Sequence, residues 1–372
     1  MPTLRGRQKG ATFGKSSPSW IGCVPGTRLP RILCIMTILL DGPIAFLRGA
    51  ILTLLVTAPL AAQTPAAAPA QLPADDAIRI REFYRLAAEV QDRIWPLWSA
   101  TPAPLLLVTS ETEFLTHHPA PPPDFKKVAE DFYARPRHFP TNLLATFPAF
   151  GPPSVIVIGE PANTDAKTST PWLFVVLHEH FHQLQNAQPG NFKATEDLGL
   201  ARGDTSGMWM LNYPFPYGDA ALGRAFAHLR DTLLAALREP DAAKFAALAA
   251  EYKAERKQFL AQLAPDDRKY LSFQIWQEGI ARYTQVVAAE AAAGYRPTAE
   301  YAALPDASPF ATYGQEMRAQ TLEALKHVEL ATAQRVAVYP FGCAEGFLLD
   351  RLDPKWKDGY FRHPFTLDPF FE

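Results

Sequence analysis

The hydrophobic pattern of the chain mixes strand and helix periods up to about residue 217 and has only helix periods after it. Residues 75–95 have a helical period, and two short apolar runs, residues 105–110 and 154–159, are typical of buried strands. Helical periods return at residues 219–238, 241–263, 266–293 and 315–332. We therefore expect an α+β fold, with a small sheet lobe followed by a mostly helical C-terminal lobe.

Start and stop signals support this division. Asp241 and Asp266 each follow a proline and can accept hydrogen bonds from free backbone N–H groups at a helix start. Near the C-terminus, Gly342 and Gly346 predict a turn before a short helix at residues 347–352. The sequence between residues 110 and 154 is rich in proline, and residues 188–217 form a polar connection. We expect both of these segments to be loops.

The segment with the clearest chemistry is residues 172–185, WLFVVLHEHFHQLQ. Its apolar start leads into His178, Glu179 and His182 in the order H-E-x-x-H. Residues four apart lie on one helix face, so both imidazoles can bind one metal ion. Glu179 then stands beside the ion without binding it, where a zinc hydrolase has its general base. Exposed histidines on an amphipathic helix are the alternative, but the preceding run is apolar all round, as in a core helix.

His180 is a third histidine within the same segment. It lies ~160° around the helix from both His178 and His182 and cannot share their ion while the helix is intact. We expect it to pack in the core or to support a neighbouring group.

A catalytic zinc ion needs a third protein ligand besides the two histidines. The metzincin pattern would supply a further histidine at position 188, but that residue is Gln188. The better candidate is Glu278, in the helix-period run IWQEGIARYTQ. The alternative for Glu278 is a surface carboxylate on an amphipathic helix.

With these two motifs, the chain resembles the gluzincin clan of zinc metallopeptidases. In that clan H-E-x-x-H is completed by a Glu on a later helix, often in an E-G-x-A-x-Y-like context, here Glu278, Gly279, Ala281 and Tyr283. The resemblance covers the two short motifs and the helical spacer, and it does not identify one peptidase family. Arg282 stands where the thermolysin-like branch has an Asp, so that branch's supporting arrangement is not carried over.

The resemblance implies a zincin-like fold, a Zn²⁺ cofactor and a peptide or protein substrate. His178, His182 and Glu278 would hold the ion, and Glu179 would take the proton of the attacking water. Tyr283, Tyr339 and His363 are candidates for stabilising the oxyanion. Two alternatives stay open: a binding or scaffold protein on a zincin-like fold, and a zinc hydrolase that acts on a non-peptide bond.

The N-terminal sequence predicts export. Residues 45–62 follow the layout of a secretory signal peptide, with cleavage near Ala62 and translation beginning at Met36. The apolar part is too short for a stable membrane span, which needs ~20 residues. We expect an extension with signal peptide at 1–62, an Ala/Pro linker at 63–74, a mixed lobe at 75–217 and a helical lobe at 218–372. The mature protein would be periplasmic or secreted.

Composition changes this picture little. The chain is 48% hydrophobic and 20% charged with a net charge of −2, as in ordinary soluble globular proteins. No basic patch of the kind that binds nucleic acid is evident in the sequence. Cleavage near Ala62 would leave Cys343 as the one cysteine of the mature chain, and we expect it to be a small core residue.

Overall fold

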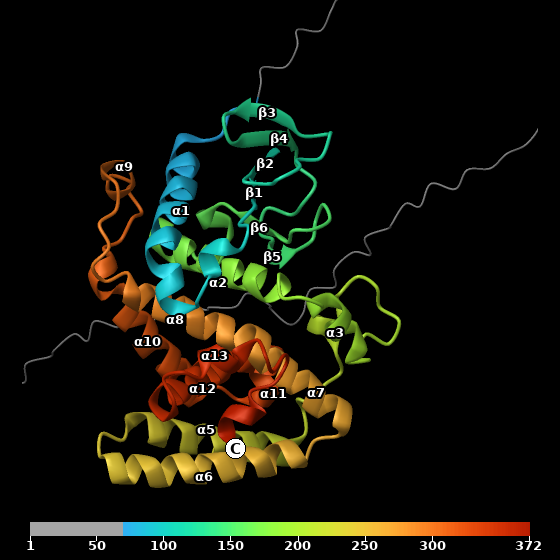
Figure 1. Cartoon of the computed structure of the whole chain (residues 1–372), viewed down its shortest axis with the longest axis vertical. Coiled ribbons are helices and arrows are strands. Elements are labelled where there is room, and N and C mark those ends of the chain that lie inside the picture. The colour runs from blue at the N-terminus through green and yellow to red at the C-terminus, as the bar shows by residue number, and fades with distance from the viewer. Residues whose placement is uncertain (1–69) are drawn as a thin grey trace, which may run out of the picture. The chain divides into compact units, whose positions relative to one another are not determined.

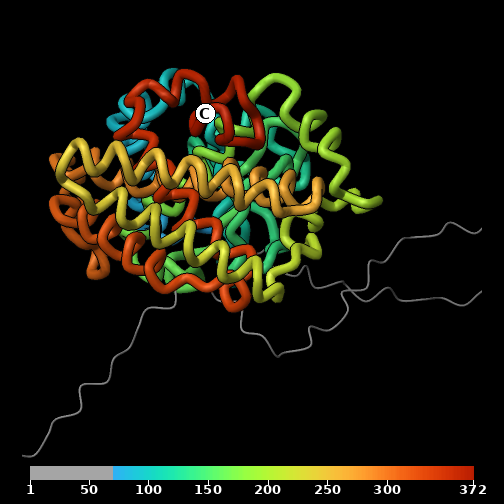
Figure 2. Tube along the Cα trace, turned by 90° about the horizontal axis from the view of Figure 1, so that it is seen from below, coloured from blue at the N-terminus to red at the C-terminus, as the bar shows by residue number. Residues whose placement is uncertain are grey.

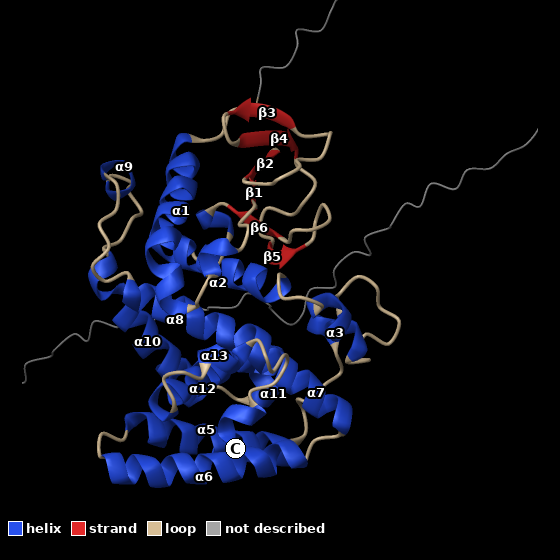
Figure 3. Ribbon diagram, in the orientation of Figure 1, coloured by secondary structure: helices blue, strands red, loops and turns tan. Residues whose placement is uncertain are grey.

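The part of the chain that the computed structural model describes, residues 70–372, is a mixed α+β fold (Figure 1). Its strands precede residue 160, and after residue 217 it forms helices without strands (Figure 3). The predicted extension and signal peptide at 1–62, the start at Met36 and most of the linker at 63–74 lie outside the described residues. The mixed α+β class predicted from the sequence is confirmed.

The sheet has six strands in the order β3-β4-β2-β1-β6-β5. Only β1 and β6 are parallel, and the other neighbours are antiparallel. The strands are β1 (Leu105–Val108), β2 (Thr112–Thr116), β3 (Lys126–Ala129), β4 (Phe132–Pro136), β5 (Leu144–Phe147) and β6 (Val155–Gly159). β5 is therefore an edge strand, paired with β6 on one side.

Side chains on the two sheet faces enter two separate clusters. Leu105 and Leu107 of β1 join the main core, whereas Leu106 and Val108 join a smaller cluster on the opposite face. This alternation follows the two-residue period of a strand. Loop aromatic residues such as Phe150 cover the smaller cluster, so both faces of β1 are buried.

The sequence predicted two of the six strands, and the four others correct its interpretation of residues 110–154 as a loop. β1 and β6 are fully buried and apolar, whereas β3 is mostly exposed and β5 is only partly buried. Strands of this second kind lack a continuous apolar run. These segments form strands because they pair with neighbouring strands, and the periodicity of a single sequence does not reveal that pairing.

Helices α1 (Ala74–Ile94) and α2 (Ser169–Asn186) follow the predicted segments and contact each other. The indole Nε1 of Trp172 donates to the carbonyl of Gly159 at 2.9 Å, which fixes α2 to the end of β6. α2 is almost entirely buried, because the sheet lies on one side of it and α8 (Ile280–Ala291) on another. This burial on several sides explains why the segment is apolar all round.

The helical part contains the paired helices α5 (Ala220–Arg238) and α6 (Ala242–Ala261), which lie side by side in Figures 1 and 2. Asp241 caps α6 as predicted, by accepting from the N–H of Lys244 at 2.9 Å. Asp266 is no cap, because α7 already begins at Pro265. The remaining helices are α3 (Asn191–Asp197), α4 (Trp209–Asn212), α7 (Pro265–Gln274), α9 (Ala299–Ala302), α10 (Phe310–His327), α11 (Leu330–Ala333), α12 (Val338–Leu352) and α13 (Lys357–Tyr360).

Two predicted boundaries need correction. The segment predicted as one helix at 266–293 is α7 and α8 joined by a π-helical segment, η3 (Ile275–Gly279). The helix predicted at 315–332 is α10, which begins earlier because Pro309 immediately precedes it and ends at His327. The connection at 188–217 also contains the short helices α3 and α4.

The predicted turn at Gly342 and Gly346 is wrong. Both glycines lie inside α12, where a Cβ atom at Gly342 would stand 2.7 Å from the Cα of Gly279 and one at Gly346 2.5 Å from the Tyr283 ring. Glycine at these positions allows α12 to lie directly against η3 and α8. Close helix approach, and not a turn, accounts for the two glycines.

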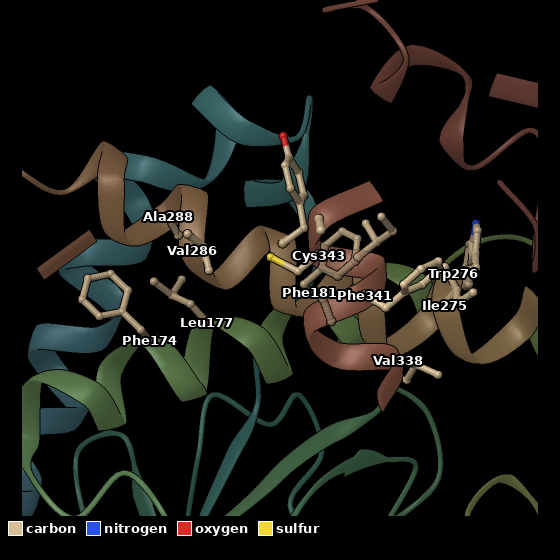
Figure 4. Packing of buried hydrophobic residues seen from close by; sticks show 14 of the residues in the cluster. Phe174, Leu177, Phe181, Ile275, Trp276, Val286, Ala288, Val338, Phe341 and Cys343 are labelled. Carbon is tan, nitrogen blue, oxygen red and sulfur yellow. The ribbon is translucent and has the colours of Figure 1, made fainter. Parts of the chain in front are cut away.

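One hydrophobic cluster links the helices around the sheet to the helical part. Figure 4 shows its centre, where Phe174 and Leu177 of α2 lie near Val286 of α8, and Phe341 and Cys343 of α12 lie close by. Cys343 is fully buried and forms no disulfide, and burial raises the pKa of its thiol to about 12. The prediction of a core residue is confirmed. Among the described residues, none of the helices has both the length and the apolar character needed to cross a membrane.

Candidate metal centre

His178 and His182 point toward each other from consecutive turns of α2. Their Nε2 atoms are 3.2 Å apart, and both side chains are more than nine-tenths buried. The four-residue spacing of the sequence produces this pair directly, because the helix is regular through the motif.

Glu278 reaches the same point from η3, far away in the sequence. Its Oε2 atom is 3.6 Å from Nε2 of His178 and 3.4 Å from Nε2 of His182. The structure thus brings together the three side chains that the sequence predicted as ligands. The carboxylate projects from a π-helical turn. Such turns are rare in proteins, and those that occur are often at functional sites.

The three ligand atoms fit a tetrahedral zinc ion. Atoms about 2.0–2.1 Å from one such ion stand about 3.3–3.4 Å apart. The observed separations of 3.2, 3.4 and 3.6 Å lie close to that value. Two imidazoles and one carboxylate are also the donor set of catalytic zinc sites that leave the fourth position for water.

Glu179 is the second carboxylate near the histidines. One oxygen atom from it and one ring nitrogen from each histidine all lie within 4.8 Å of one another, so a cation could also be drawn here with Glu179 as a ligand. Its Oε2, however, accepts a hydrogen bond from the hydroxyl of Thr146 in β5 at 2.7 Å. We assign Glu278 as the ligand, because its oxygen is close to both imidazoles. With this assignment Glu179 is left for the non-ligand role that the sequence predicted.

Gln185 fixes both the second histidine and the segment that carries Glu278. Its Oε1 is 2.6 Å from Nδ1 of His182, so Nε2 is the ring nitrogen that could bind a metal ion. Its amide nitrogen donates to the carbonyls of Trp276 and Gln277 at 3.3 and 3.2 Å. One side chain therefore links α2 to η3 beside the ligand.

The electrostatics of the site suit a cation. Burial alone would raise the pKa of the Glu278 carboxyl, but His182, His178 and Arg335 together hold it well below its usual range. Burial opposes the charged form of His182, yet the charge of Glu278 outweighs it and raises the pKa of this histidine to about 9. Glu278 thus presents a full negative charge to whatever lies between the two imidazoles.

His180 is turned away from this centre. Its ring nitrogens lie 2.8 Å from Oε1 of Gln183 and 3.1 Å from Oε1 of Gln91, and its ring stacks on Trp98. Burial lowers its pKa to about 4, so the ring is neutral. It is a core residue, in agreement with its angular position on the helix.

Of the three oxyanion candidates, the structure places one at the centre. The Tyr339 ring stacks near that of His178, with centroids 6.2 Å apart, and burial raises the pKa of its hydroxyl. The Tyr283 hydroxyl instead donates to the Asp350 carboxylate at 2.7 Å. His363 is exposed in the C-terminal segment beside Phe370. Tyr283 and His363 therefore do not line the site.

Sequence reasoning missed three residues at the centre: Gln185, Thr146 and Arg335. Gln185 could have been found, since it lies three residues after His182 on the same helix face. Thr146 lies in a strand that the sequence did not predict. Arg335 precedes α12, in the short helical turn η4 (Gln334–Ala337), and no motif marks it. Comparisons of the chain with protein-family models, with curated proteins and with solved structures found no match.

Proposed function

We propose that this protein is a zinc-dependent hydrolase of gluzincin type with a zincin-like fold, and that it is a peptidase. His178, His182 and Glu278 are its metal ligands, and Glu179 is its general base. The observation that carries the proposal is the triangle of ligand atoms, 3.2–3.6 Å on each side, built from α2 and η3. Its size suits one tetrahedral zinc ion.

The chemistry follows from the placement of these side chains. Zinc, when bound, supplies a Lewis acid that brings the pKa of its water toward neutrality. Glu179 accepts the proton of the attacking water and returns it to the leaving amine. The Thr146 hydroxyl holds one oxygen of Glu179, so the carboxylate is oriented before substrate arrives. Tyr339, whose ring lies beside His178 and whose hydroxyl is neutral, donates to the developing oxyanion.

The edge strand β5 favours a peptide over other substrates. Thr146 of β5 pairs with Ile156 of β6 in the sheet and also contacts Glu179. Within the described residues, β5 has no strand on its other side. An extended peptide can add to such an edge through backbone hydrogen bonds, and it would then run past the base.

The location of the protein belongs to the same proposal. The signal-like segment before Gln63 supports export to the periplasm or the medium, where a hydrolase of peptides would meet its substrates.

The decisive experiment compares wild type with Glu179→Gln on a mixed peptide library at equal zinc content. Glu179 is not a ligand, so the variant should keep its zinc and its fold. Loss of a general base should lower the cleavage rate by ~10²–10⁴. Zinc binding without cleavage of any peptide by wild type would favour a non-peptide bond or a non-catalytic role. Equal cleavage by the two proteins would contradict the mechanism.

A further inference from the structure

We infer that Arg335 binds a carboxylate of the substrate next to the scissile bond, so that the enzyme selects peptides carrying a negative charge at that position. This inference rests on the proposed function. It concerns a residue outside both sequence motifs.

Arg335 lies against the ligand Glu278 and is only loosely held. Its Nη1 is 3.5 Å from Oε1 of Glu278, 3.4 Å from Oε1 of Gln274 and 3.3 Å from the Tyr339 hydroxyl. All three distances are long for charge-assisted hydrogen bonds, which are ~2.7–2.9 Å. Among the described residues no acceptor contacts its Nε or Nη2, and the side chain is 21% exposed. Most of the planar donor fork is therefore available.

Arg335 also shares its carboxylate partner with the proposed metal ion. Glu278 is the one carboxylate paired with it in the described part of the chain. In the proposed site a divalent ion balances the negative charge of Glu278. The ion and Arg335 together then carry more positive charge than Glu179 and Glu278 balance. A carboxylate of the substrate would restore neutrality and form a bidentate pair with the guanidinium group.

The position of Arg335 restricts where that carboxylate can be. The guanidinium contacts one oxygen of Glu278 while the other oxygen faces the two imidazoles. It is thus one carboxylate group away from the metal position. Successive residues of a peptide are ~3.8 Å apart, so a carboxylate reaching Arg335 belongs to a residue beside the scissile bond. A free C-terminus and an Asp or Glu side chain both provide this chemistry.

Kinetics on matched peptides test the inference and separate the two sources. One series ends in a free carboxylate or its amide, and a second, amidated series has Glu or Gln beside the cleaved bond. In one of the two series, wild type should cleave the acidic peptide with a KM about 10- to 100-fold below that of its neutral partner. Arg335→Gln should remove this preference, so that the KM values for the acidic and neutral members become equal, and Arg335→Lys should restore it in part.

Arg268→Gln is the matched control, since Arg268 is half exposed and its partner Asp368 keeps a second arginine, Arg256. It should retain the preference. Equal KM values for acidic and neutral peptides in wild type would overturn the inference. So would an Arg335→Gln variant that loses activity equally on both.

Binding measurements keep this inference separate from the proposed function. Zinc-loaded Glu179→Gln protein is titrated in a calorimeter with two pairs of acetylated tripeptides: a free acid and its amide, and two amides that differ by Glu or Gln. The acidic member of one pair should bind about 10- to 100-fold more tightly than its neutral partner, and adding Arg335→Gln should abolish the difference. If no peptide is cleaved by wild type, the peptidase proposal fails, yet this difference still supports Arg335. If neither the free acid nor the Glu peptide binds more tightly than its neutral partner, the Arg335 inference fails even when peptides are cleaved.

Discussion

The side chains of the proposed metal centre are contacted by residues that would not bind the metal themselves. Gln185 orients His182, Thr146 orients Glu179, and Arg335 contacts Glu278. Contacts of this kind fix the direction of a side chain at a metal centre. The arrangement of the centre therefore depends on a further residue of α2 and on residues from β5 and η4.

His182→Ala should abolish stoichiometric zinc binding, because His178 and Glu278 alone are too few for tight coordination. Zinc per chain is measured by mass spectrometry of metals after dialysis, and wild type should carry about one. His228→Ala is the control, since that histidine is exposed and pairs with Glu255. Full zinc retention in His182→Ala would refute the ligand assignment.

Gln185→Leu should weaken zinc affinity about 10- to 100-fold, because His182 loses the acceptor that orients it and η3 loses its link to α2. Affinity is measured by competition with a chelator of known strength. Gln183→Leu is the matched control, a buried glutamine of the same helix that binds the carbonyls of Pro104 and Ser154. It should lose stability but keep its zinc affinity. An equal loss of affinity in both variants would speak against the role of Gln185.

Among the elements, η3 and α12 show how helix packing positions a ligand. Gly279 follows Glu278 directly, and its Cα lies so close to Gly342 of α12 that a Cβ at Gly279 would be 2.7 Å from it. The wider turn of a π-helical segment and the small residues on both sides allow this approach. The ligand carboxylate is thus held by backbone contact between two helices.

Gly279→Ala should destabilise the protein by about 1–3 kcal/mol, because the added methyl group forces α12 and η3 apart. The free energy of unfolding is measured by denaturant titration, with zinc affinity as a second readout that should also fall. Gly223→Ala in α5 is the control, since no atom lies within 4 Å of its Cβ position. That change should be neutral or stabilising by up to ~1 kcal/mol. Similar effects of the two substitutions would contradict the packing argument.

The elements that the sequence predicted correctly are those whose signal is local. The pair His178 and His182 follows from helix period alone, and β1 and β6 follow from continuous apolar runs. The π-helical turn and the glycines of α12 depend on contacts between segments far apart in the chain. A single sequence contains no register between such segments, so a helix with two internal glycines resembled a turn.

For the whole molecule, the proposed metal centre lies where the two halves of the described chain meet. α2 belongs to the part with the sheet, and η3 belongs to the helical part. Glu278 could be nominated from the sequence by resemblance, but its distance from the histidines required the packed fold. A metal held across this junction should stabilise the folded state as a whole.

Removal of zinc should lower the thermal unfolding temperature. A ligand that binds only the native state stabilises it by about 2.7 kcal/mol at a free concentration 100-fold above its Kd. For a chain of this size we expect a decrease of several degrees with a chelator, reversed by added zinc, in differential scanning calorimetry. His182→Ala should unfold at the same temperature with and without chelator. No shift in wild type would mean that no metal bridges α2 and η3.

The position of the metal itself tests the account most directly. Crystals of zinc-loaded protein, measured on both sides of the zinc absorption edge, should show one anomalous peak about 2.0–2.2 Å from Nε2 of His178, Nε2 of His182 and one carboxylate oxygen of Glu278. Glu179 should lie near the peak without contacting it. A peak bound by Glu179 in place of Glu278, or no peak between α2 and η3, would contradict the proposed centre and the mechanism built on it.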